Sequence, residues 1–199
     1  MNFIKKSRRN LTTVITFISA LTLSNSVMSN ELSPLVDSFE NNKVTNFGQP
    51  RMLLTDTTAG GKTIGKADVT NGTIHLSGNI VPPRGQPGWS SLVLPLSPMG
   101  KPQDVSQFSG IRLSLKVNSG NISVSANSLD ITNFDYHSAQ VAVSNDGNFH
   151  EVKIPFKSMK RIWSEQTELN PKTLNSLSIV AYSPQKATFD FIIDEVSFY

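Results

Sequence analysis

Cysteine is absent from the 199-residue chain. This absence excludes disulfide bonds, thiolate nucleophiles, zinc sites built on cysteine, and a lipidated cysteine behind a signal segment. The stability of the fold must therefore come from a hydrophobic core, and a chain of this length is long enough to build one.

A strong net charge is also missing once the N-terminus is set aside. The formal charge is +3, but four of the 18 basic residues lie within residues 5–9, and no acidic residue precedes Glu31. The rest of the chain has 14 basic and 15 acidic residues, a net charge of −1, and its basic residues are scattered. We therefore expect no nucleic-acid partner, because such a partner requires a concentrated basic surface.

Residues 1–29 have the pattern of a secretory signal peptide. Basic residues at 5–9 precede an uncharged run over residues 11–23, and Val27 and Ser29 are acceptable around a signal-peptidase cut. This run of about 13 residues is shorter than the roughly 20 that a membrane-spanning helix needs. We predict a signal peptide at 1–29 and a single domain at 30–199. The protein would be periplasmic or secreted, with membrane contact only through the signal segment before cleavage.

Two other targeting signals stay open as alternatives to the general secretory route. Residues 7–11 resemble a twin-arginine signal, although Thr12 and Thr13 depart from that pattern. A mitochondrial presequence is also basic and free of acidic residues. Its charges should spread along an amphipathic helix, whereas here they stop at Arg9.

Alternating apolar residues predict strands through most of the chain. Residues 111–117 place Ile111, Leu113, Leu115 and Val117 on one face, and residues 122–126 resume the alternation after a turn cluster at 118–121. This pattern predicts a hairpin. Further strand-like runs cover residues 35–40, 51–55, 73–77, 90–96, 140–143, 149–156, 174–182 and 188–199.

Helical periodicity over three turns is missing. Residues 158–163 and 171–174 are expected to form short helices, and turns of the Asn/Asp-Gly type are expected at Asn71-Gly72 and Asp146-Gly147. Residues 81–88 hold three prolines and two glycines and must form a surface loop. About ten short strands without repeats predict an all-β fold, an antiparallel β-sandwich or jelly roll with few short helices.

The first and last strand-like runs both carry carboxylates. If these strands pair, Asp37, Glu40 and Asp194 come near one another, and clustered carboxylates suit a structural Ca²⁺ ion. The alternative is that these three residues lie in water at the rim of the sheet. No other cofactor is expected.

The sequence matches none of the common catalytic motifs in full. Gly60-Gly61-Lys62-Thr63 resembles the end of a phosphate-binding loop, but the glycine required five residues before Gly61 is Asp56, so we expect only a turn. His75, His137 and His150 lack metal-site spacing, and no Gly-x-Ser-x-Gly motif occurs. The fold could assemble a hydrolytic pair from Asp130, Asp135, Glu165 and Glu168, although solvated carboxylates are the simpler interpretation.

Aromatic residues in or beside loops are the other candidate site. An aromatic ring can stack on the apolar face of a sugar while neighbouring polar groups bind its hydroxyls. In the alternative, the tryptophans cap the core from its edges. The candidate ligand-binding residues are Trp89, Phe134, Tyr136, His137 and Trp163.

Five blocks, in order, resemble the CIA30 family, which is named for a mitochondrial complex I intermediate-associated protein. They cover residues 36–40, 56–63, 104–113, 149–156 and 193–196. The resemblance spans about residues 35–199 and implies a domain similar to galactose-binding-like jelly rolls, including some carbohydrate-binding modules. The chain departs from the family at residues 82–89, where members tend to have a glycine-rich stretch containing phenylalanine.

The resemblance implies a noncatalytic role. We expect an exported CIA30-like binding module whose ligand is a glycan or a protein. The first alternative is an assembly factor or chaperone for a respiratory membrane complex, NADH:ubiquinone oxidoreductase. The work of some members inside mitochondria or the cytoplasm conflicts with an export signal. The second alternative is a hydrolase with the carboxylate site described above.

Overall fold

The computed structural model describes residues 32–199, which form two antiparallel β-sheets. The predicted signal peptide at 1–29 lies outside the described residues. The six-stranded sheet has the order β3 (Ile64–Thr70), β4 (Thr73–Ile80), β11 (Ala187–Phe198), β6 (Gly110–Ser119), β9 (His150–Pro155), with β1 (Leu35–Asp37) also paired to β11. The five-stranded sheet has the order β2 (Met52–Thr55), β5 (Gly88–Pro95), β10 (Leu174–Ser183), β7 (Asn121–Ser128), β8 (His137–Val141).

The predicted all-β sandwich is therefore confirmed. Helical structure in residues 32–199 is limited to three 3₁₀ turns: η1 (Asp56–Ala59), η2 (Phe156–Ser158) and η3 (Pro171–Thr173). No helix among these described residues is long and apolar enough to cross a membrane. The core lies between the sheets and includes the predicted face Ile111, Leu113, Leu115 and Val117, together with Ile122, Val124 and Ala126.

The predicted hairpin of residues 111–126 is wrong, because the turn at 120 passes from one sheet to the other. β6 pairs with β11 and β9, whereas β7 pairs with β10 and β8. Gly120 makes the change of sheet at φ +97°, and a Cβ there would lie 2.9 Å from Cβ of Phe189. Two strands that face each other across a core alternate in the same way as two paired strands, so the sequence pattern did not separate the two cases.

The other local predictions had mixed outcomes. Asn71 and Gly72 have φ of +51° and +73° and close the β3–β4 hairpin, as an Asn-Gly turn of type I′ does. Asp146-Gly147 instead lies in the connection from β8 to β9, which crosses between sheets. Residues 81–87 form the expected loop, and the helix expected at 171–174 is the 3₁₀ turn η3.

The helix expected at 158–163 does not form. The backbone of Lys160 instead exchanges two 2.9 Å hydrogen bonds with the backbone of Ser138 in β8. This bridge extends the five-stranded sheet beyond β8 by one short segment. Pairing to a sheet edge has therefore overridden the local helical tendency.

The two ends of the described chain pair as predicted, with Leu35 opposite Ser197 and Asp37 opposite Val196. The predicted calcium site is nevertheless not assembled. Asp37 is fully buried and binds the guanidinium of Arg51 at 2.5 and 2.6 Å, whereas Glu40 and Asp194 are exposed. No three potential metal ligands gather anywhere in residues 32–199. Because Arg51 already neutralises Asp37, these residues do not fit a Ca²⁺ ion.

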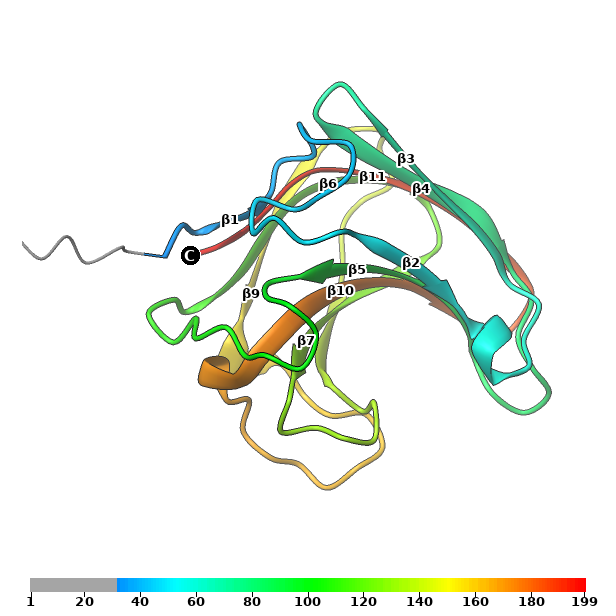
Figure 1. The fold of residues 1–199 in the computed structure, drawn as a ribbon. Helices are drawn as coiled ribbons and strands as arrows, with labels where there is room; N and C mark the ends of the chain where they lie inside the picture. The colour runs from blue at the N-terminus through cyan, green and yellow to red at the C-terminus, as the bar shows by residue number, and fades with distance from the viewer. Residues whose placement is uncertain (1–31) are drawn as a thin grey trace, which may run out of the picture. The chain divides into compact units, whose positions relative to one another are not determined.

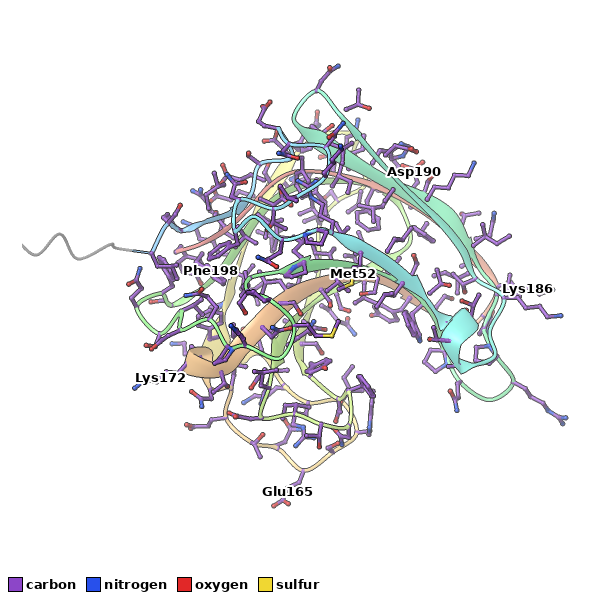
Figure 2. All side chains as sticks on the ribbon, viewed as in Figure 1. Met52, Glu165, Lys172, Lys186, Asp190 and Phe198 are labelled. Atoms are coloured by element: carbon purple, nitrogen blue, oxygen red, sulfur yellow. The ribbon has the colours of Figure 1, made fainter. Side chains whose placement is uncertain are left out.

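Both sheets bend in the same sense, and the outer face of the five-stranded sheet lies inside the bend (Figure 1). The outer face of the six-stranded sheet lies outside it and carries charged side chains such as Asp190 (Figure 2). The ion pairs Arg112–Glu195, Arg112–Glu151 and Lys153–Glu151 also lie on this convex side. The concave side, which is the outer face of the five-stranded sheet, carries uncharged side chains instead.

Candidate functional site

The outer face of the five-stranded sheet is lined by uncharged side chains, of which serine is the most frequent. Residues directly opposite each other on antiparallel strands point to the same face, so the register assigns this face directly. One row is Leu54, Ser91, Val180, Ser123 and Gln140, and the next is Met52, Val93, Ser178, Ser125 and Ser138. Rows of Trp89, Tyr182 and Asn121, and of Pro95, Ser176 and Asn127, complete it. We call this set the serine face.

No Asp, Glu, Lys, Arg or His side chain belongs to the serine face as these described strands define it. Its hydrogen-bonding groups are hydroxyls and side-chain amides, each able to donate and accept. Asn127 donates to Ser176 at 2.9 Å and to Ser178 at 2.7 Å, which leaves both serine protons free to donate outward. The Oδ1 atom of Asn127 is buried and has no partner within residues 32–199. The groups that can donate to and accept from a neutral polar ligand are the more exposed ones, such as Ser123, Ser125 and Gln140.

Trp89 and Tyr182 form the aromatic end of the serine face, because they are direct partners on β5 and β10. The backbone N–H of Trp89 donates to Oδ2 of Asp56 at 3.1 Å. Asp56 is fully buried and also accepts from the backbone N–H of Thr63 at 3.0 Å and from its hydroxyl at 2.6 Å. The backbone at the start of β5 is thus fixed at the position that sets the direction of the indole.

The Gly60-Gly61-Lys62-Thr63 segment serves this same arrangement. Gly60 ends η1 with φ +83°, as expected for a turn. A Cβ on Gly61 would lie 2.2 Å from Cγ of Asp56, so only glycine leaves room for the buried carboxylate. Asp56 is a residue that sequence reasoning missed as part of a site; its only signal was that it interrupts a phosphate-loop pattern.

Two loops form a rim at the other end of the sheet, residues 129–136 between β7 and β8 and residues 161–169 after the Lys160 bridge. Asp135 joins them. Its carboxylate is buried and accepts from the backbone N–H groups of Ile162 at 2.9 Å, Trp163 at 3.1 Å and Ser164 at 2.7 Å. Burial alone would raise the pKa of Asp135, but the hydrogen bonds from Ile162, Ser164 and Trp163 outweigh it and place the pKa below its ordinary value.

The rim holds large apolar side chains in water. Phe134 is 77% exposed at a left-handed φ of +61°, and Ile162 and Trp163 are 71% and 69% exposed. Such a backbone conformation costs about 1–3 kcal/mol and persists where the surroundings enforce it, commonly at functional positions. The three hydrogen bonds that Asp135 accepts from residues 162–164 hold the two rim loops together and supply this constraint.

The predicted ligand-binding residues divide into two groups. Trp89 lies on the serine face, and Phe134 and Trp163 lie exposed on the rim. Tyr136 is half-buried with its ring edge-on to Phe134, 6.3 Å between centroids, and burial raises its pKa. His137 is 2% exposed and donates from Nε2 to the carbonyl of Thr167 at 2.7 Å, so it is buried and bonded to the 161–169 loop of the rim.

Two of the four carboxylates considered for hydrolysis have other partners. Asp135 clamps the rim, and Asp130 accepts from Asn170 at 3.0 Å and from the Thr173 hydroxyl at 2.9 Å. Glu165 and Glu168 are exposed, and Glu165 points away from the protein at the tip of its loop (Figure 2). A general acid needs a carboxyl whose pKa is raised, whereas the pKa of Asp135 is lowered. The structure gives no support to the paired-carboxylate alternative.

Comparison with known proteins extends these observations. A family model described as complex I intermediate-associated protein 30 (CIA30) matches residues 39–193. A search of curated proteins found no match.

Three solved structures share the fold. The family 11 carbohydrate-binding module of the cellulosomal cellulase Lic26A-Cel5E of Clostridium thermocellum matches with 15% identity and a TM-score of 0.58, covering 84% of this chain and 94% of that one. A family 11 module from the same organism, in complex with a β-1,3-1,4-mixed-linked tetrasaccharide, matches with 17% identity, a TM-score of 0.57 and coverages of 83% and 94%. The agarase AgWH50C matches with 5% identity and a TM-score of 0.54, covering 82% of this chain but 24% of the enzyme. At these identities the likeness establishes the fold alone.

Proposed function

The chain belongs to the complex I intermediate-associated protein 30 (CIA30) family, and from this premise and its carbohydrate-binding-module fold we propose that it is a noncatalytic module that binds a glycan. The binding surface is the serine face. The observation that carries the proposal is the chemistry of this face, where hydroxyl and amide groups without charge adjoin one aromatic pair, Trp89 and Tyr182.

The physical match is with a neutral polyhydroxyl ligand. Hydrogen bonds between neutral groups replace bonds to water with a modest net gain of about 0.5–1.5 kcal/mol each, and no buried charge has to lose its hydration. The apolar face of a sugar ring can stack on the indole of Trp89, which contributes area that hydroxyls cannot. Binding would therefore depend on the aromatic pair for affinity and on the serines for orientation.

The test is a glycan array followed by titration calorimetry with the best-binding polymer. Trp89→Ala should weaken binding at least about tenfold, because truncating a buried aromatic anchor in an interface commonly costs 2 kcal/mol or more. Phe149→Ala is the matched control, since Phe149 is an aromatic residue 46% exposed outside the serine face. Absence of binding to every glycan, or equal losses in the two variants, would refute the proposal.

A second candidate function is assembly of a membrane complex, as the family's name suggests. The exposed apolar rim of Phe134, Ile162 and Trp163 favours it, because exposed apolar patches can mark protein-interaction sites. Crosslinking in intact membranes, comparing wild type with Trp163→Ser, tests this role. Loss of a defined crosslinked partner in that variant would support assembly, and an unchanged pattern would count against it.

We also propose export to the periplasm or the cell exterior, on the strength of the N-terminal sequence. The expected mature protein begins after Ser29. Mass spectrometry of the fractionated protein measures this directly, and an intact N-terminus in the cytoplasmic fraction would contradict export.

A further inference from the structure

Both tryptophans of the chain are held in the same way. The backbone N–H of Trp89 donates to Asp56, and that of Trp163 donates to Asp135, each at 3.1 Å. The two aspartates are 0% and 1% exposed, and each accepts three hydrogen bonds, largely from backbone N–H groups. Burying a carboxylate is costly unless such bonds compensate for its lost hydration. The chain bears this cost beside both tryptophans.

The two tryptophans lie at opposite corners of the sheet. Trp89 lies at the start of β5, in the row that it shares with Tyr182. Trp163 lies in the rim loop that follows the bridge between Lys160 and Ser138, beyond β8. Figure 1 shows η1, next to the start of β5, at one end of the five-stranded sheet and the rim loops at the other. Across the sheet, four strand spacings of together about 19 Å separate β5 from the Lys160 segment. Along the strands, Lys160 is in the row of Val93, four residues or about 13 Å from Trp89. A single sugar ring cannot reach from one corner to the other.

We propose that Trp89 and Trp163 are two contact points of one extended site, set in place by Asp56 and Asp135 as positioning residues, and that the ligand is therefore a chain of several sugar units. This inference rests on the proposed function. The serine face between the corners supplies neutral hydrogen-bonding groups along the path, including the accessible side chains of Ser123, Ser125 and Gln140. The clamps fix the backbone of both tryptophans in the free protein, which reduces the entropy lost on binding.

The proposal predicts how affinity depends on ligand length. A disaccharide reaches one corner and should bind through Trp89 alone. An octasaccharide also reaches Trp163, and the second contact should raise the affinity about tenfold or more because it forms within an already bound complex. Trp163→Ala should remove this gain and leave disaccharide affinity unchanged, whereas Trp89→Ala should weaken binding at every length.

The chain allows each corner to be observed separately, since it contains two tryptophans. In Trp89→Phe the fluorescence reports on Trp163 alone, and in Trp163→Phe it reports on Trp89 alone. With β-1,3-1,4-linked glucan oligosaccharides, Trp89 should respond to the disaccharide and to the octasaccharide, and Trp163 only to the octasaccharide. Adding Asp135→Asn to the Trp89→Phe protein should abolish the Trp163 response, although Trp163 itself is retained. Lys172→Gln, an exposed substitution near the same loops, is the control.

Each result decides between the two proposals. An unchanged Trp163 signal with a responsive Trp89 overturns the extended site and leaves glycan binding intact. No response of either tryptophan to any length, together with a blank glycan array, overturns both. A full Trp163 response in the Asp135→Asn protein overturns the positioning role. If that variant is unfolded by circular dichroism, Ser164→Pro replaces it, because proline removes one N–H donor to Asp135 and keeps the carboxylate.

Discussion

The ion pair of Asp37 and Arg51 joins the two sheets, and removing it should be costly. Asp37 ends β1 in the six-stranded sheet, and Arg51 directly precedes β2 in the five-stranded sheet. Their side chains are 1% and 7% exposed and make two short hydrogen bonds. The guanidinium also donates to the carbonyl of Asn41 at 2.8 Å and lies 5.1 Å from the ring centre of Phe39.

Arg51→Met keeps an apolar stem but leaves the carboxylate of Asp37 buried without its cation. Breaking a buried pair in this way costs about 3–5 kcal/mol. In a domain of this size 1 kcal/mol shifts Tm by about 2–4 °C, so Tm should fall by about 6–20 °C. Asp37→Asn should show a loss of similar size. The double variant should lose less than the sum of the two, because it leaves no unpaired charge.

Thermal and urea unfolding followed by circular dichroism measure these losses. The control is Lys153→Met, which breaks an exposed ion pair with Glu151 at 3.5 Å and should change stability by less than about 1 kcal/mol. Each protein is also melted with calcium and after EDTA. Equal losses in Arg51→Met and Lys153→Met would refute the reasoning. A Tm that calcium raises in the wild type but not in Asp37→Asn would show that Asp37 holds a cation after all.

Three further outcomes are expected. Gly61→Ala should lower the free energy of unfolding in urea by more than about 2 kcal/mol, because the added Cβ would lie 2.2 Å from Asp56. Gly85→Ala, at φ +78° with open space around it, should cost about 1 kcal/mol. Equal costs would contradict the packing argument. Asp135→Asn should lower stability by about 1.5–3 kcal/mol at pH 7. Because folding lowers the pKa of Asp135, the extra stability of the wild type is present above the unfolded pKa near 3.9 and should vanish as the pH falls through the folded pKa. A stability difference between wild type and Asp135→Asn that persists at pH 2 would contradict this reasoning. Ser125→Leu should weaken glycan binding with little change in Tm, and Ser77→Leu, on β4 in the other sheet, should leave binding unchanged; similar titration curves for both would exclude the serine face.

Part of the fold could be predicted because burial acts locally on strand periodicity. The alternation at 111–117 gave the correct core face, and Asn71-Gly72 gave the correct turn, since both signals depend on a few neighbouring residues. Strand partners depend on residues far away in the chain. The turn at 118–121 therefore looked like a hairpin, although Gly120 carries the chain past Phe189 into the other sheet.

The candidate site was predictable only in its aromatic residues. Trp89, Phe134 and Trp163 stood out because large apolar side chains near loops are unusual. The serines gave no signal, because a serine on a strand is ordinary until the register places several on one face. Asp135 was considered as an acid, and its role as a clamp depends on N–H groups nearly thirty residues away. The sequence suggests a calcium ligand at Asp37 because it does not show that Arg51 reaches this carboxylate.

The position of β11 has a consequence for how the domain is made. β11 lies between β4 and β6 in the six-stranded sheet, and it is the last strand along the chain. Until it is synthesised, the β3–β4 hairpin and the β6–β9 pair have no common neighbour, and their inner edges remain open. Closure of the domain must therefore wait for the final strand, and contacts this distant in sequence form slowly. From the synthesis of β6 to that of β11, the nascent chain consequently presents two unpaired strand edges, and in this period a chaperone would have most to protect.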